Sequence, residues 1–324
     1  MKALVQEDNS KKLYIGKFED PVIGNDDLLI EVKATAVNRA DLIQKKGLYD
    51  PPKGASPIIG LEVAGIIVEV GKNVSGWNLG DRVFSILPGG GYAELVSLPS
   101  DMAMKIPDNL SFIEAAAIPE AFLTAFFNMQ LLGNLEAHES VLIHAGASSV
   151  GSAAIQLAKV LQSKTIVTAG SQKKLDFCYS IGADTAINYK HESFSNVVLQ
   201  KTNNEGVQMV LDLIGASYWE DNMKSLSQNA RWLIIGVLGG VETTVNLREI
   251  MRKHIKIIGS TLRTRSEESK ADLVQSFSIH ALPLFYQGKL NPVIDSVFNW
   301  DKVNEAHQHM ESSNNIGKIV LEVD

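Results

Sequence analysis

Residues Ser140–Gly151 read S-V-L-I-H-A-G-A-S-S-V-G, an apolar run that ends in a turn of small residues. The next stretch, Ser152–Gln162, is apolar with helical spacing. A strand, a tight turn and a helix start in this order leave free backbone N–H groups and the positive end of the helix dipole facing the turn. The sequence therefore predicts a site here for the phosphates of a dinucleotide.

The residues after the following strand favour NADPH over NADH. The strand predicted at Lys164–Thr168 runs into A-G-S-Q-K-K at 169–174. An NAD site usually carries a carboxylate about 20 residues after the glycine turn, where it accepts hydrogen bonds from the ribose. This stretch has no carboxylate, and Ser171, Lys173 and Lys174 suit an additional phosphate instead. The alternative is that both lysines are solvated residues of the next helix.

Strand-like and helix-like patterns alternate from Ser140 to Leu262. The strands are expected at Val141–His144, Thr165–Thr168, Thr185–Tyr189, Met209–Ile214, Arg231–Gly236 and Ile255–Leu262. Helical spacing lies between them at Ser152–Gln162, Gln172–Ile181, Ser193–Thr202 and Tyr218–Ser227. This alternation predicts an α/β protein with a doubly wound parallel sheet of the Rossmann type.

The rest of the chain has a different pattern. Its first part has short strands between Gly, Pro, Asn and Asp turns and predicts a compact β-rich, barrel-like domain, with strands at Leu28–Ala36, Glu62–Val70 and Tyr92–Val96. The tail is too short for a domain of its own, with helices expected at Ser269–Gln287 and Asp301–Ser312 and strands near Asp295–Phe298 and at Gly317–Glu322. We therefore expect a β-rich domain of residues 1–122 and 264–324 and a Rossmann domain of residues 123–263.

Composition limits the class of protein. At 324 residues the chain is longer than most single domains. A net charge of −7, with no lysine or arginine cluster beyond a pair, argues against nucleic acid as a partner. No stretch predicts a signal segment or a membrane span, so we expect a cytoplasmic protein with no membrane partner. The single cysteine, Cys178, excludes a disulfide framework.

Several motifs follow one another along the chain: A-V-N-R-A-D at 36–41, G-L-Y-D-P-P at 47–52, A-S-P-I-I-G-L-E at 55–62, G-L-E-V-A-G at 60–65, T-A-G-S-Q-K-K-L at 168–175 and N-I-G-K-I-V-L-E at 315–322. With these motifs the chain resembles the medium-chain dehydrogenase/reductase superfamily over essentially its whole length. Within the superfamily it is similar to the zinc-free quinone oxidoreductase branch, above all to the tumour-suppressor-inducible quinone oxidoreductases. The resemblance implies that the β-rich domain is GroES-like.

The resemblance also implies a site without a metal. Zinc alcohol dehydrogenases of the superfamily place a Cys near the position of Asn38 and a His where this chain has Leu61. Glu62 alone cannot replace a His/Cys ligand set. We therefore expect no metal, and an acceptor such as a quinone, which is electrophilic enough to take a hydride without a Lewis acid.

Three catalytic candidates follow from the resemblance. Asn38 and Tyr49 are expected near the nicotinamide, where a polar group can orient a carbonyl, and Thr124 is expected to approach the ring. The structural alternatives are that Asn38 caps a helix beginning at Arg39, Tyr49 packs in the turn before Pro51, and Thr124 is an ordinary helix residue.

The turn of small residues supplies the first cofactor candidates, which by the resemblance lie at the pyrophosphate: Ala145, Gly146, Ser148, Ser149, Val150 and Gly151. Ser149 departs from the family pattern, which generally has Gly there, and a serine narrows the allowed backbone angles. Its hydroxyl can still donate to a phosphate, so we expect altered binding. The alternative is a loss of dinucleotide affinity.

Further cofactor candidates lie at later strand ends. By the resemblance Ser171, Lys174 and Tyr189 surround the adenosine 2′-phosphate. Strand ends of an open parallel sheet face the ligand, which adds Gly215, Gly236, Leu238, Gly239, Leu262 and Arg263, and the returning tail adds Lys318. The alternative for Arg263 and Lys318 is a surface charge. His144 is expected to pack or to bind backbone rather than to act as a base.

Together these features predict an NADPH-dependent, metal-free quinone oxidoreductase that takes its proton from solvent. Two alternatives stay open: reduction of an activated C=C bond in an enone or alkenal, and a non-catalytic NADPH-binding protein. A strand at Ile255–Thr261 would be an exposed edge, where the superfamily commonly forms its dimer, so we expect a homodimer. The alternative is an edge covered within one chain.

Overall fold

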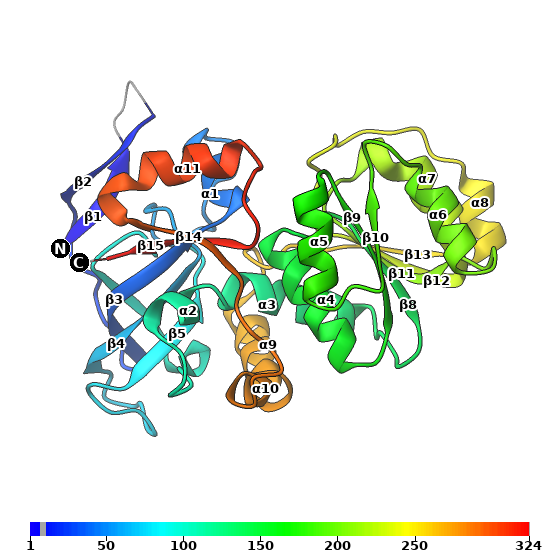
Figure 1. Cartoon of the computed structure of the whole chain (residues 1–324). Helices are drawn as coiled ribbons and strands as arrows, with labels where there is room; N and C mark the ends of the chain where they lie inside the picture. The colour runs from blue at the N-terminus through cyan, green and yellow to red at the C-terminus, as the bar shows by residue number, and fades with distance from the viewer. Residues whose placement is uncertain (7–10, 324) are drawn as a thin grey trace. The chain divides into compact units, whose positions relative to one another are not determined.

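The computed structural model describes residues 1–6 and 11–323, and its chain forms two compact units (Figure 1). The first unit comprises Met1–Leu123 and Leu262–Asp324, and the second comprises Thr124–Thr261. We expected the second unit to span residues 123–263, so its predicted start lies one residue and its predicted end two residues from the observed bounds. Helix α3 (Pro119–Phe126) contains the first boundary. No helix among the described residues is long and apolar enough to span a membrane.

The second unit is built on a parallel sheet with the strands β8 (Ser140–Ile143), β9 (Lys164–Ala169), β10 (Thr185–Asn188), β11 (Val207–Asp212), β12 (Leu226–Ile234) and β13 (Lys256–Gly259). In the described part of the chain the six strands follow the order β10, β9, β8, β11, β12, β13, and every adjacent pair is parallel. The order changes direction between β8 and β11, which is where open sheets of this kind bind their ligands. The predicted doubly wound sheet is confirmed.

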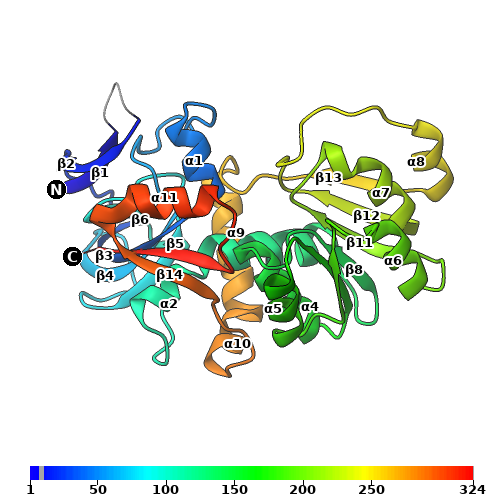
Figure 2. The same cartoon turned by 45° about the horizontal axis from the view of Figure 1, so that its top comes forward.

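Helices cover both faces of this sheet: α4 (Ser149–Val160), α5 (Gln172–Ser180), α6 (Phe194–Lys201), α7 (Trp219–Ser225) and α8 (Leu247–Lys253). Figures 1 and 2 show α4 and α5 on one face and α6 and α7 on the other. A sheet covered on both faces needs strands that are apolar throughout. Val141, Leu142 and Ile143 accordingly have no exposed surface.

Several bounds in this unit differ from the prediction: the strand predicted at Ile255–Leu262 ends at Gly259, and α8 is not among the predicted helices. Helix α4 begins at Ser149, three residues early, because Ser148 caps it. Strand β12 begins at Leu226 rather than at Arg231, which ends α7 at Ser225. The strand bends at Asn229, whose φ is 58°, and pairs with β11 on both sides of the bend.

The first unit is β-rich, with the strands β3 (Asp27–Val37), β4 (Glu62–Val70), β5 (Arg82–Ile86), β6 (Leu95–Pro99), β7 (Met104–Lys105), β14 (Ile294–Asn299) and β15 (Lys318–Glu322). In its described residues these seven strands form one sheet in the order β14, β15, β3, β4, β5, β7, and β6 also pairs with β3. Strands β1 (Lys2–Gln6) and β2 (Leu13–Lys17) pair with each other. The tail belongs to this unit because β15 pairs with β3.

The remaining helices of the first unit are α1 (Arg39–Lys45), α2 (Phe112–Ala116), α9 (Glu267–His280), α10 (Leu282–Tyr286) and α11 (Val303–Glu311). The prediction of a single helix at Ser269–Gln287 is wrong, because the helix is interrupted at Ala281, between α9 and α10. Pro283 causes the break because it has no N–H to donate and its ring conflicts with the preceding turn. The helix predicted at Asp301–Ser312 starts later, after a 3-10 turn.

Candidate functional site

The turn between β8 and α4 is where we expect the phosphate site. Ser148 is the N-cap of α4, and its Oγ accepts a hydrogen bond from the N–H of Gly151 at 3.0 Å. Ala145 opens the turn with a left-handed φ of 53°. Ser149 is the first helical residue, so a serine fits there and the expected backbone restriction does not arise. The helix thus begins in the turn itself.

Gly151 allows the helix to begin so close to the turn. A Cβ at this position would lie 2.3 Å from the carbonyl oxygen of Ala145 and 2.8 Å from Cα of Gly146, so only glycine fits. The N–H groups of Ser149 and Val150 lie in the first helical turn and cannot be satisfied within the helix. These donors, together with the helix dipole, fit the oxygens of a pyrophosphate.

Three expected residues gather at the carboxyl ends of β9 and β10. Ser171 is the N-cap residue of α5, and the N–H of Lys174 donates to its carbonyl oxygen at 3.0 Å. The hydroxyl of Tyr189 lies over Gly170, where an added Cβ would be 2.7 Å from it. Lys174 is partly buried, whereas Lys173 is exposed. Hydroxyl and ammonium groups at this edge fit an additional phosphate.

The loops after β11 and β12 lie against each other. Gly215 has φ 80° and ψ −130°, a conformation that only glycine adopts readily. The N–H of Gly239 donates to the carbonyl oxygen of Ile214 at 2.7 Å. A Cβ on Gly236 would lie 2.8 Å from a backbone oxygen, and Leu238 is 56% exposed. All four expected residues of these loops therefore lie at the carboxyl edge of the sheet.

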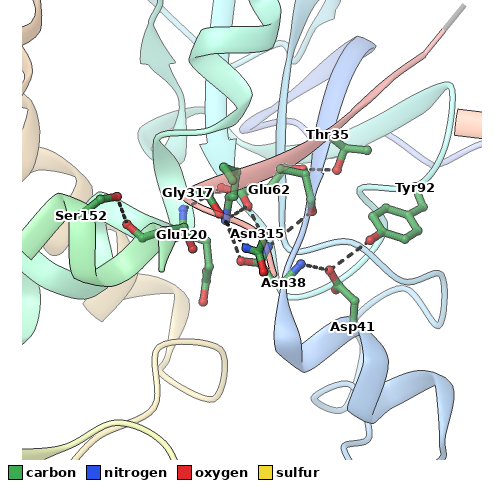
Figure 3. A network of polar contacts seen from close by, with 12 residues as sticks. Thr35, Asn38, Asp41, Glu62, Tyr92, Glu120, Ser152, Asn315 and Gly317 are labelled. Carbon is green, nitrogen blue, oxygen red and sulfur yellow. Dashed lines mark hydrogen bonds and ion pairs between the residues drawn. The ribbon is translucent and has the colours of Figure 1, made fainter. Parts of the chain in front are cut away.

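A buried charge cluster occupies the first unit (Figure 3). Glu62 Oε1 accepts hydrogen bonds from Lys318 Nζ at 2.6 Å and from Asn38 Nδ2 at 2.7 Å. Asn38 Oδ1 in turn accepts from Lys318 Nζ at 2.7 Å. Glu62 and Lys318 are 0% and 1% exposed. The amide of Asn38 is thus held at both ends by the chain itself, and its action on an acceptor stays a prediction.

These residues do not fit a zinc ion. Asn38 and Leu61 stand where the resemblance places Cys and His, and neither is a zinc ligand of ordinary type. Both carboxylate oxygens of Glu62 are engaged, since Oε2 accepts from the N–H of Glu120 at 2.9 Å, and the ammonium of Lys318 repels a cation. The described residues contain no group of three or more His, Cys, Asp or Glu that could hold a metal.

A second buried cluster adjoins the first through the backbone of Asn38 (Figure 3). The N–H of Asn38 donates to Asp41 Oδ2 at 2.7 Å, and the hydroxyl of Tyr92 donates to the same oxygen at 3.1 Å. That hydroxyl also lies 3.2 Å from His307 Nε2. Burial raises the pKa of Asp41 to about 7 and lowers the pKa of His307 to about 3. The His307 ring is therefore neutral at physiological pH.

Arg263 is also held within the first unit. Its guanidinium lies over the ring of Tyr49, 5.0 Å from the ring centroid, and donates to the carbonyl oxygens of Pro88 and Tyr49 and to Gln44 Oε1. Arg263 is 5% exposed, so the alternative that Arg263 and Lys318 are surface charges is wrong.

The structure divides the expected residues between the units. The cofactor candidates from Ala145 to Gly239 share the carboxyl edge of one sheet. Thr124 is the first residue of the same unit, within α3, and its carbonyl oxygen accepts from Asn128 Nδ2 at 2.8 Å. The other candidates belong to the first unit: Asn38, Tyr49, Leu262, Arg263 and Lys318.

Sequence reasoning missed Glu120, in the first turn of α3. Burial and the charge of Glu62 raise the pKa of Glu120 to about 8, so its carboxyl group holds a proton at neutral pH and can donate one. The local sequence marks only a helix start, with Pro119 as its first residue. Nothing in it indicates that Glu62 is a neighbour.

Two family models match the chain. The model described as alcohol dehydrogenase GroES-like domain matches residues 24–108, and the model described as zinc-binding dehydrogenase matches residues 149–278. The first match confirms the GroES-like character that we expected for the β-rich unit.

Known relatives and solved structures are similar to this protein over nearly the whole chain. The quinone oxidoreductase of Lama guanicoe is 31% identical, with 93% of this chain and 90% of the relative covered. The quinone oxidoreductase-like protein 2 homolog of Nematostella vectensis is 29% identical, with 94% and 84% covered.

Among solved structures, an NAD-dependent alcohol dehydrogenase is 31% identical with a TM-score of 0.89, and both chains are covered completely. A mycobacterial protein in complex with NADPH is 25% identical with a TM-score of 0.89, over 99% of this chain and 100% of the other. The CurK enoyl reductase is 26% identical with a TM-score of 0.87, over 100% and 98%.

The buried ion pair predicts a large effect on stability. Lys318→Met leaves the charge of Glu62 uncompensated in the interior and should lower the free energy of unfolding by about 3–5 kcal/mol. Adding Glu62→Gln should recover most of the loss because a neutral amide needs no counter-charge. Urea unfolding measures both, with the exposed Lys289→Met as the control. A single Lys318→Met variant as stable as the wild type would contradict the pairing.

The raised pKa of Asp41 predicts a pH-dependent stability. Because the pKa in the folded state is about 7 and an unfolded aspartate has about 4, the folded protein holds a proton that the unfolded chain has released. Stability should therefore fall as the pH rises from about 4 to 7. The asparagine in Asp41→Asn cannot lose a proton, so the stability of this variant should fall less steeply with pH. The stability of the exposed control, Asp272→Asn, should follow that of the wild type. Identical slopes for Asp41→Asn and the wild type in urea unfolding would refute the assignment.

Proposed function

The chain belongs to the medium-chain dehydrogenase/reductase superfamily and is a nicotinamide-dependent oxidoreductase, and we propose that it carries hydride from NADPH to a quinone. The observation that carries the proposal is the set of Ser171, Lys174 and Tyr189 at the ends of β9 and β10. In a Rossmann site this position faces the ribose 2′ group. Hydroxyl and ammonium groups bind a phosphate there, whereas a carboxylate would repel it.

The second unit would hold the rest of the dinucleotide at the turn after β8. The N–H groups of Ser149 and Val150 would donate to the pyrophosphate, and Gly151 keeps that approach open. When bound, NADPH supplies a hydride from its nicotinamide ring. The chain's part is to bind and orient this group, which is how positioning lowers a reaction barrier.

The first unit supplies the polar groups for an acceptor. A quinone is a strong electrophile and forms a delocalised anion on reduction, so the lack of zinc ligands is no obstacle to its reduction. In this proposal Asn38 and Tyr49 orient the acceptor and Thr124 approaches the nicotinamide. The proton comes from solvent, and Glu120, protonated at neutral pH, can relay it.

We further propose that two copies associate along β13. In the described residues this strand pairs only with β12, so its other edge offers unpaired backbone groups. Val241, Leu247 and Met251 precede it in the sequence and are 78%, 68% and 73% exposed, and exposed apolar side chains suit contact with a partner. Light scattering should give twice the mass of one chain, and a single-chain mass would contradict this.

The lone cysteine and the NADPH site suit the cytoplasm.

Two neighbouring lysines provide a matched test of cofactor choice. Lys174→Ala should weaken NADPH binding about tenfold or more, because a charge-assisted bond to the 2′-phosphate is lost, and should leave NADH binding unchanged. Lys173→Ala, at the exposed neighbour, should change either affinity by about twofold at most. Calorimetric titration measures the dissociation constants of NADPH and NADH for both variants. An equal loss for NADH, or equal effects of the two substitutions, would contradict the assignment of Lys174.

Acceptor assays distinguish the proposed reaction from its alternatives. With NADPH in excess, 1,2-naphthoquinone should be reduced with a higher kcat/KM than a 2-alkenal. A clear preference for the alkenal would establish C=C reduction instead. The structural similarity to the CurK enoyl reductase makes that reaction the main alternative. Tight NADPH binding without turnover of either compound would indicate a non-catalytic protein.

A further inference from the structure

The buried His144, at the carboxyl end of β8, has no role in the proposed chemistry, yet both of its ring nitrogens are hydrogen-bonded. Nε2 lies 2.7 Å from Asn222 Oδ1, which is an acceptor, so Nε2 carries the hydrogen. Nδ1 lies 3.0 Å from Thr168 Oγ1 and accepts from that hydroxyl. Burial lowers the pKa of His144, which keeps the ring neutral. The ring is thus held in one tautomer by two side chains.

The network continues from Asn222 to the turn after β11. Asn222 Nδ2 donates to Asp212 Oδ2 at 3.2 Å, and Trp232 Nε1 donates to the same oxygen at 3.0 Å. Asp212 Oδ1 accepts from the N–H groups of Ile214 at 2.7 Å and Gly215 at 3.0 Å. Asp212 has no exposed surface, and these four donors compensate its burial. The conformation of the Gly215 turn therefore depends on this network.

Ring contacts and one backbone bond make two further connections. The ring of His144 meets that of Tyr218 edge-on at 4.8 Å, and Tyr218 meets Tyr189 edge-on at 6.2 Å. The N–H of Gly146 in the phosphate turn donates to the carbonyl oxygen of Thr168 at 2.9 Å. His144 and its direct contacts thus connect the turn after β8, the end of β9, the turn after β11 and Tyr189.

We propose that His144 is a positioning residue for the phosphorylated dinucleotide, holding the pyrophosphate turn at the correct distance from the 2′-phosphate residues. The turn begins one residue after His144, and Ser171 and Lys174 follow Thr168 by three and six positions in the sequence. This inference rests on the proposed NADPH preference and adds a cause for it besides charge. NADPH uses both phosphate subsites at once, so a displacement of one from the other weakens NADPH binding more than NADH binding.

Threonine substitutions in β9 separate positioning from stability. Thr168→Val keeps the side-chain shape, removes the hydroxyl and leaves His144 Nδ1 without a donor in the interior. Thr165→Val is the matched control: Thr165 is equally buried at 1% exposure in the same strand, and its hydroxyl donates to Asp184 at the opposite end. Thr168→Ser restores the hydroxyl. Tyr218→Leu, at a partly buried position, tests the ring connection separately.

The readouts are the melting temperature and the dissociation constants of NADPH and NADH, measured by calorimetry. Both valine variants should melt at a lower temperature than the wild type. Only Thr168→Val and Tyr218→Leu should reduce the preference for NADPH over NADH, by about threefold to tenfold, and Thr168→Ser should restore it. A preference that neither variant changes, whatever the melting temperature, would overturn the positioning role. A wild-type protein without a preference would instead overturn the proposed function itself.

Discussion

The parallel alignment of the strands in the second unit is the constraint on which its candidate site depends. Because all six strands of its described sheet run the same way, the loops that follow β8, β9, β10, β11 and β12 leave from one edge. Each loop then needs only a simple local feature: small residues in the first, donors in the second, a positive-φ glycine in the fourth. The sheet converts these separate features into one surface that can bind a long, anionic ligand.

The first unit depends on a different interaction, an ion pair that is removed from water. Such a pair gains little net stability, because the desolvation of both charges offsets their attraction. It does, however, require that the chain's tail return, since Lys318 lies on β15 and Glu62 on β4, with β3 between them. The cluster also joins Asn38, Asp41 and Tyr92 into one buried polar network, so substitutions at distant positions should affect the same site.

Local patterns predicted much of the fold. The alternation of apolar strands with amphipathic helices was sufficient for the doubly wound sheet, and the small-residue turn marked the start of α4 to within three residues. That error arose because Ser149 and Val150 show no apolar spacing, while the cap at Ser148 depends on a hydroxyl contact. The break at Ala281, which Pro283 causes, was missed because the apolar periodicity continues past the proline. Residue partnerships were predicted least well, since Lys318 and Glu62, or His144 and Asn222, meet only after the chain has folded.

The central claim is that the carboxyl edge of the parallel sheet binds a dinucleotide with a phosphate on its adenosine ribose. The most direct measurement is a calorimetric titration of the wild-type protein with adenosine 2′,5′-bisphosphate and with adenosine 5′-monophosphate, which differ only in that phosphate. The account predicts that the bisphosphate binds at least about tenfold more tightly. Equal affinities, or tighter binding of the monophosphate, would contradict it.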